Sequence, residues 1–139
     1  IGIDVKIRVM EWQSFLDQVV DKRTFDAFIL GWGLSRDPDN YETWHSSKTK
    51  KGEYNVIEYS NPEVDRLLVA GRRTFDINKR KKIYRRIHEV LAEDQPYAFL
   101  YVSDETPIIH NRFKGIEPAP LGITYNFIKW YVPKNRMEW

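Results

Sequence analysis

Apolar and polar residues alternate along residues 3–9, IDVKIRV. A period of two predicts a strand with one buried face. The apolar spacing then becomes helical, and five residues fall on one helix face: Trp12, Phe15, Leu16, Val19 and Val20. Residues 25–32, FDAFILGW, return to a near-continuous apolar run, which is typical of buried parallel strands. This order of strand, helix and strand predicts a parallel pair in an α/β sheet.

Two further helices are predicted in the second half of the chain. The first starts after Asn61, whose side chain can cap free amides, with Pro62 at the first helical position. The second carries apolar residues at a spacing of four and must end by Pro96, because the residue before a proline is disfavoured in a helix. Residues 97–102 and 122–133 are the remaining strand candidates. The expected fold class is therefore α/β, a mixed sheet with flanking helices.

Composition narrows the possible functions. Over 139 residues, 22 Lys and Arg stand against 20 Asp and Glu, and the net charge of +2 argues against a nucleic acid as partner. The absence of Cys excludes disulfides, thiolate metal sites and Cys nucleophiles. No apolar run of roughly 18 residues is present. The opening residues, IGIDVKIRVMEW, show neither an initiator Met nor a signal peptide, so we expect a piece of a longer protein.

The stretch GWGLSRDPDNYETWHSS, residues 31–47, combines two Trp, two Asp and a Pro. Paired aspartates suggest a calcium loop, but that loop needs Gly at its sixth position and Glu at its twelfth, where this chain has Glu42 and Lys48. Capping a short helix is the better interpretation of Asp37. Two glycines also resemble the start of a dinucleotide fingerprint, whose third small residue is replaced by Arg36. Neither a metal nor a cofactor is predicted.

The sequence offers no catalytic pattern. His45, His88 and His110 stand far apart, and none has a metal-ligand partner four residues on, so surface or packed positions suit them better. The basic run NKRKKIYRR, residues 78–86, could follow phosphates. Its apolar residues keep helical spacing, however, so the charges occupy the remaining solvated faces. We predict neither an enzyme nor a nucleic-acid-binding protein.

A binding site at Trp32 is the interpretation that remains. Trp32 ends the apolar run, and open α/β sheets place their ligands at the carboxyl ends of strands. Gly31 and Gly33 flank it and would let the backbone come close to a ligand. Trp44 could face the same cleft. The spacing equally supports the alternative that both Trp rings belong to the core.

Four ordered stretches resemble one protein family: FDAFILGWGLSRDPDNYETWHSS, YSNPEVDRLL, KRKKIYRRIHEVLAEDQPYAFLY and FKGIEP. They are similar to the C-terminal part of the extracytoplasmic solute-binding proteins of peptide-type ABC importers, a family that also includes nickel- and oligosaccharide-binding members. The resemblance implies a type II periplasmic-binding-protein-like fold, with two lobes joined by a hinge. Residues 1–139 would form a C-terminal fragment that holds most of lobe II, and about 123–139 would return towards lobe I.

The resemblance also implies which residues bind the ligand. They follow the apolar run, with one aromatic residue further on: Gly31, Trp32, Gly33, Leu34, Ser35, Arg36, Asp37 and Trp44. In peptide-binding relatives this loop often carries an aspartate that pairs with the free amino group of the peptide. Ser35 stands at that place here and offers a hydrogen bond without a charge, although a desolvated ammonium without a counter-charge is costly. Asp37 could substitute only if the loop bends it inward.

The implied function is that of a non-enzymatic solute-binding protein. It would capture an oligopeptide between two lobes and deliver it to the transmembrane permease subunits of an ABC importer. The alternative ligand is an oligosaccharide, with Trp32 and Trp44 stacking on sugar rings. The implied location is extracytoplasmic, either periplasmic or lipid-anchored at the cell surface, and no cofactor is expected.

Overall fold

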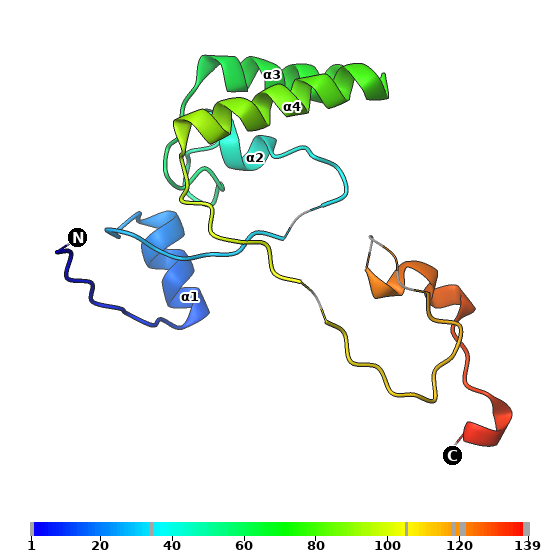
Figure 1. Cartoon of the computed structure of the whole chain (residues 1–139). Helices are drawn as coiled ribbons and strands as arrows, with labels where there is room; N and C mark the ends of the chain where they lie inside the picture. The colour runs from blue at the N-terminus through cyan, green and yellow to red at the C-terminus, as the bar shows by residue number, and fades with distance from the viewer. Residues whose placement is uncertain (1, 34, 105, 118, 120–121, 138–139) are drawn as a thin grey trace. The chain divides into compact units, whose positions relative to one another are not determined.

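The computed structural model describes residues 2–33, 35–104, 106–117, 119 and 122–137. The chain divides into two compact units, residues 1–98 and residues 99–139. The helices of the first unit are α1 (Trp12–Phe15), its π-helical continuation η1 (Leu16–Asp21), α2 (Tyr41–Trp44), α3 (Pro62–Arg73) and α4 (Ile77–Asp94) (Figure 1). The second unit contains two 3-10 helices, η2 (Ile123–Lys129) and η3 (Lys134–Arg136).

Side-chain caps set where α3 and α4 begin. The Asn61 side chain accepts hydrogen bonds from two backbone N–H groups of the first turn of α3, and Pro62 occupies the first helical position. The Asp76 carboxylate accepts from a backbone N–H in the first turn of α4. α4 ends at Asp94 and is followed by its C-cap, Gln95, whose φ of 46° is left-handed and which directly precedes Pro96. The predicted start of α3 after Asn61 and the predicted end of α4 before Pro96 are confirmed.

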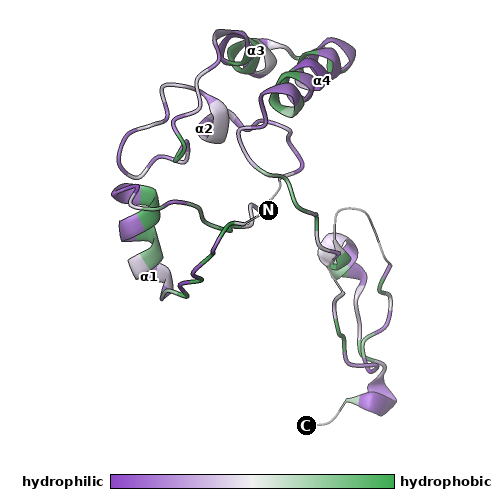
Figure 2. Cartoon of the chain, turned by 60° about the vertical axis from the view of Figure 1, so that its left-hand side comes forward, coloured by the Kyte–Doolittle hydropathy of each residue, from purple (hydrophilic) through white to green (hydrophobic). Residues whose placement is uncertain are grey.

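The core of the first unit lies between α2, α3 and α4. In Figure 2 apolar and hydrophilic residues occupy different sides of α3 and α4, as their amphipathic sequences require. The buried core residues are apolar or aromatic: Trp44, Val64, Leu68, Tyr84, Ile87, Val90 and Leu91. Gly71 keeps α3 close to α4, because a Cβ on it would lie 2.9 Å from the Tyr84 ring. In the part of the chain that the structure describes, no helix is long and apolar enough to cross a membrane.

The predicted N-terminal helix is confirmed, although its second half, η1, has π-helical geometry. Its Phe15 ring meets the Phe28 ring edge to face, with centroids 5.9 Å apart, so the helix packs on the segment that follows it. Arg23 connects this region to a later loop. Its guanidinium pairs with the Glu58 carboxylate and donates to a backbone carbonyl of the same loop.

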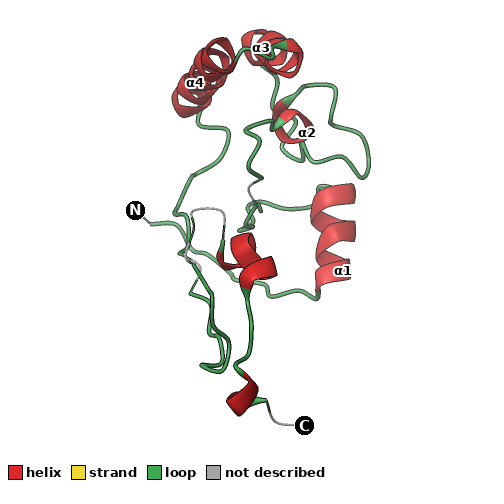
Figure 3. Ribbon diagram, turned by 90° about the vertical axis from the view of Figure 1, so that its right-hand side faces the viewer, coloured by secondary structure: helices red, strands yellow, loops and turns green. Residues whose placement is uncertain are grey.

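The predicted mixed sheet is wrong for the residues that the structure describes. Figure 3 shows no strand among them, and a single isolated antiparallel bridge joins Lys114 to Tyr131. Residues 3–9 and 25–32 are irregular rather than paired. The alternating apolar side chains of the first segment stay open to solvent, and Val9 is 92% exposed.

The other two strand candidates are not strands either. Residues 97–102 are irregular, and most of residues 122–133 form η2. The physical reason is that a strand needs a neighbour to take its backbone hydrogen bonds. A period of two shows which side chains share a face, but it does not supply the partner.

Asn126 organises the second unit. Its side chain is 3% exposed, donates to the carbonyl of Gly115 at 2.8 Å and accepts from the indole N–H of Trp130 at 2.8 Å. Gly115 has a φ of 78°, and a Cβ on it would clash with the carbonyl oxygen of Lys129. Both the left-handed backbone and the close approach therefore require glycine at this position.

Replacing Gly115 by alanine should destabilise the second unit. The left-handed backbone alone costs about 1–2 kcal/mol for a residue with a Cβ, and the clash with Lys129 adds to that cost. Gly122→Ala is the matched control, since Gly122 also has a positive φ, 94°, but nothing lies within 4 Å of its built Cβ. Hydrogen exchange of the Trp130 indole N–H should accelerate more in Gly115→Ala than in Gly122→Ala. Equal acceleration in both variants would contradict the close approach.

Candidate functional site

Trp32 stands at the end of the apolar run with part of its ring open to solvent. Its side chain is 39% exposed, and its ring meets the Tyr54 ring edge to face, with centroids 5.7 Å apart. Nothing lies within 4 Å of the place where a Cβ would stand on Gly31 or Gly33. The backbone on both sides of the Trp32 ring is therefore open to the approach of a ligand.

Tyr54 is a part of this site that the sequence did not reveal. It is the single aromatic residue in the polar turn KKGEYN, and nothing in that pattern links it to Trp32. The next residue, Asn55, is fully buried and donates to the carbonyls of His45 at 3.2 Å and Tyr59 at 2.8 Å. Because Asn55 fixes the turn, Tyr54 is held beside the Trp32 ring.

Ser35 and Asp37 form a tight turn that uses both side chains. The Ser35 hydroxyl accepts from the N–H of Asp37 at 3.1 Å and donates to the carbonyl of Asp37 at 2.8 Å. The Asp37 carboxylate accepts from the N–H of Asp39 at 2.9 Å and from the Arg80 guanidinium at 2.7 Å. The hydrogen bond from Arg80 is the main reason that the pKa of Asp37 lies below its usual value, and the N–H of Asp39 adds to it. Asp37 is therefore an anion bound to α4.

Asp39 is held in the same manner by α3. Its carboxylate accepts from the N–H of Tyr41 at 3.1 Å and from Nε of Arg72 at 2.6 Å. The Arg72 guanidinium also lies over the Tyr41 ring, 4.0 Å from its centroid, and reaches the Glu42 carboxylate at 3.5 Å. These contacts fasten the loop and α2 to α3. The sequence carried no signal that would pair these aspartates with particular arginines.

The remaining predicted site residues are Trp44, Arg36 and Leu34. Trp44 is 6% exposed and packs in the core, with the Tyr97 ring 4.7 Å away, so its ring is not open to a ligand. The Tyr97 side chain also forms a hydrogen bond with Trp32. Arg36 is exposed. Leu34 lies outside the described residues. A role in ligand binding for these three residues stays a prediction.

Ser and His side chains of the loop after α2 meet Asp65 of α3, but their geometry differs from a catalytic triad. The N–H and the hydroxyl of Ser47 both meet Nδ1 of His45, at 3.1 and 2.8 Å, and Asp65 is 4.0 Å from the same nitrogen. In a triad the serine and the carboxylate contact opposite ring nitrogens. Asp65 instead accepts from the N–H and hydroxyl of Ser46. Among the described residues, no three metal-ligating side chains form a cluster.

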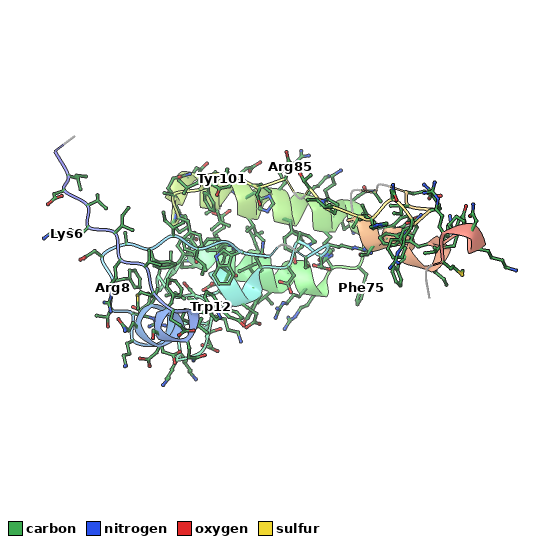
Figure 4. All side chains as sticks on the ribbon, turned by 90° about the horizontal axis from the view of Figure 1, so that it is seen from below. Lys6, Arg8, Trp12, Phe75, Arg85 and Tyr101 are labelled. Carbon is green, nitrogen blue, oxygen red and sulfur yellow. The ribbon has the colours of Figure 1, made fainter. Side chains whose placement is uncertain are left out.

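A hollow of about 670 Å³ lies against α4. It is lined by Pro38 of the loop and by α4 residues that include Arg80, Tyr84 and Arg85, the last of which is labelled in Figure 4. Trp32 is not among the lining residues. The hollow and the open Trp32 ring are therefore different surface features.

The sequence is similar to those of peptide-binding proteins, although no protein-family model matches it. It is 37% identical over 135 residues to the oligopeptide-binding protein AppA of Bacillus subtilis, a match that covers 96% of this chain and 25% of that protein. It is 35% identical over 118 residues to protein XP55 of Streptomyces lividans, covering 83% of this chain and 21% of that protein. It is 27% identical over 124 residues to the dipeptide-binding protein of Escherichia coli K12, covering 88% and 23%. The chain spans roughly a quarter of the length of these relatives.

The structure is similar to the solved structure of AppA from Bacillus subtilis in complex with a nonapeptide. The TM-score is 0.75 at 36% sequence identity, and the match covers 96% of this chain and 26% of that chain. The chain therefore shares the fold of the corresponding quarter of a peptide-binding protein.

The pair of Asp37 and Arg80 should make the attachment of the loop sensitive to acid. The folded-state pKa of Asp37 lies below 3.8, the unperturbed value, so the favourable contribution is fully present above that pH and is lost as pH falls through the lowered pKa. NMR titration of the Asp37 carboxyl carbon should give a midpoint below 3.8, and Arg80→Gln should return it towards 3.8. Asp94, whose pKa is lowered by hydrogen bonds from Tyr59 and Asn61, is the internal control. An Asp37 midpoint that does not respond to Arg80→Gln would contradict this cause.

Proposed function

We propose that this chain, which is homologous over most of its length to oligopeptide- and dipeptide-binding proteins, is part of a solute-binding protein that captures an oligopeptide for a peptide-type ABC importer. The observation that carries the proposal is the similarity in sequence and fold to AppA, whose solved structure is a complex with a nonapeptide. The protein binds its solute without chemical change. It works outside the cytoplasm, periplasmic or lipid-anchored, and hands the solute to the transmembrane permease subunits.

Residues 31–35 form the ligand loop. The open backbone at Gly31 and Gly33 suits hydrogen bonding to the main chain of a peptide, which is the same for every side-chain sequence. The partly open Trp32 ring, with Tyr54 against its edge, offers an apolar contact to one side chain of the ligand. Together these groups support a peptide more readily than a small charged solute.

The amino end of the peptide meets no free carboxylate on this loop. Ser35 stands where relatives often carry an aspartate, and its hydroxyl is bound to Asp37. Asp37 is itself paired with Arg80, so pairing with a ligand ammonium would require this ion pair to break. The loop therefore selects for the main chain of the peptide and only weakly for a free amino end.

Residues 1–139 supply most of the second lobe, and the segment near 123–139 returns towards the first. The proposal is supported by the length of the chain, which spans roughly a quarter of its relatives, and residues 99–139 form a compact unit of their own. A ligand that touches both lobes favours the closed state, which is a shift of population. A chain with one lobe should accordingly bind weakly.

An oligosaccharide is not supported as the ligand. AppA and the Escherichia coli relative are both named for binding peptides. Stacking on sugar rings would use the open faces of both Trp32 and Trp44, but Trp44 is 6% exposed in the core. One open ring remains, which is too little for a platform that accepts successive sugars.

The full reading frame that encodes this chain should retain peptides through purification. Native mass spectrometry of the protein, purified without added ligand, should show bound masses that resolve into peptides, because closed lobes exchange solute slowly. Trp32→Ala should retain a reduced amount, since the backbone contacts remain. Bound masses spaced by a hexose would contradict the proposal. So would a ligand-free protein that fails to bind an equimolar pool of synthetic nonapeptides.

N-acetylation of the same nonapeptide pool should change its affinity by no more than about threefold. Losing a charge-assisted hydrogen bond to a free carboxylate would cost about 1.5–3 kcal/mol, which is more than tenfold in Kd. A pool amidated at the carboxyl end controls for the general effect of removing a terminal charge. A loss of tenfold or more, specific to acetylation, would show that the amino end meets an unpaired carboxylate.

A further inference from the structure

Two ion pairs fasten the loop that precedes α2. Asp37 pairs with Arg80 of α4 at 2.7 Å, and Asp39 pairs with Arg72 of α3 at 2.6 Å. In each case the carboxylate also accepts a backbone N–H of the loop or of α2, so one side chain both shapes the turn and fastens it. Attachment to two helices fixes both the position and the orientation of the turn. With a single contact, the turn could still rotate about that contact.

Both guanidinium groups are held in place by contacts other than the loop carboxylates. Nε of Arg80 donates to the carbonyl of Gly71 at 3.1 Å, and its guanidinium lies 5.0 Å from the centroid of the Tyr84 ring. Arg72 lies over the Tyr41 ring at 4.0 Å. A planar guanidinium held in this way loses little freedom when it pairs, so it directs the position of its partner.

We propose that Arg80 and Arg72 are positioning residues for the ligand loop: through Asp37 and Asp39 they set where the Trp32 ring stands. This inference rests on the proposed function, in which Trp32 contacts the peptide. It adds two residues that touch no ligand and lie outside the ligand loop.

A short stretch of chain connects the turn at residues 35–39, which the two ion pairs hold in place, to the Trp32 ring. The Ser35 side chain is tied to Asp37 by two hydrogen bonds, and three peptide steps, about 11 Å at full extension, separate Ser35 from Trp32. Trp32 also rests against Tyr54. The ring is thus held by Tyr54 of the 48–56 turn, by a side-chain hydrogen bond with Tyr97 and by the chain that connects it to Ser35. Loss of the ion pairs would free the last of these three links and leave the other two.

The ion pairs should affect loop position more than stability. Asp37 is 55% exposed and Arg72 is 40% exposed, while their partners Arg80 and Asp39 are 26% and 22% exposed. Ion pairs that remain open to solvent on one side contribute little to the free energy of unfolding. Stability comes instead from the apolar side chains buried between α3 and α4. Removal of one charge should therefore leave a folded protein whose loop is displaced.

The experiment uses the full-length protein labelled with 5-fluorotryptophan, in which Trp32→Phe assigns the Trp32 fluorine resonance. Arg80→Gln removes the fastening charge from α4. Asp37→Asn removes the charge from the loop but keeps an oxygen to accept the local N–H. Arg85→Gln is the matched control, because Arg85 is an exposed arginine of the same helix, whereas the ion pairs of Asp37 and Asp39 are with Arg80 and Arg72.

We expect Arg80→Gln and Asp37→Asn each to shift the Trp32 resonance in ligand-free protein. Each should also weaken binding of the nonapeptide pool by about tenfold, and the combined variant should bind no more weakly than either alone, because both remove one interaction. Arg80→Lys keeps the positive charge but lacks the planar guanidinium with its several donors, so its affinity should lie between those of Arg80→Gln and the unaltered protein. Arg85→Gln should change neither the resonance nor the binding.

A Trp32 resonance that stays in place in both Arg80→Gln and Asp37→Asn would overturn the positioning role. An equal shift in Arg85→Gln would also overturn it, since the effect would then follow from net charge. If Arg80→Gln unfolds the helices, as judged by far-ultraviolet circular dichroism, Asp37→Asn decides, because it leaves α4 unchanged. If the unaltered protein binds no nonapeptide, the proposed function fails, and the Trp32 resonance still decides whether the two arginines position the ring.

Discussion

The packing of α3 against α4 is the constraint on which the first unit depends. Val64 and Leu68 are fully buried between the helices, and burial of apolar side chains is the main source of stability in such a small core. Once the two helices are packed, Arg72 near the end of α3 and Arg80 in the first turns of α4 are cations at fixed positions. The loop before α2 takes its place from them. Burial of apolar side chains therefore stabilises the first unit, and the two ion pairs determine where the loop before α2 lies.

This arrangement decides which chemistry the loop can offer a ligand. Asp37 and Asp39 look like an acidic site in the sequence, but both carboxylates are already paired with arginines. What stays open is the backbone beside Gly31 and Gly33 and part of the Trp32 ring. Under the proposed function, main-chain groups and one aromatic ring would recognise the features that all peptides share. A cation or a sugar would require oxygen ligands or stacked rings that these residues do not present.

The extended segments behave differently from the helices for a physical reason. α3 and α4 make their backbone hydrogen bonds within themselves, so a capped amphipathic sequence is enough to form them and packing then stabilises them. Residues 3–9 have an equally regular apolar pattern, yet Val9 is 92% exposed. A strand forms only when another segment accepts its hydrogen bonds, and no such ladder exists among the described residues.

The sequence alone determined features that depend on near neighbours in the chain. The Asn61 cap with Pro62, the helix end before Pro96 and the place of Trp32 after an apolar run all involve residues within about one helical turn. Tertiary structure decided the rest: that Trp44 is buried while Trp32 is partly open, and which cation holds Asp37. Arg80 is 43 residues away from Asp37, and their contact exists only because α3 and α4 pack together. Local patterns specify elements, whereas the partner of a side chain depends on how distant elements meet.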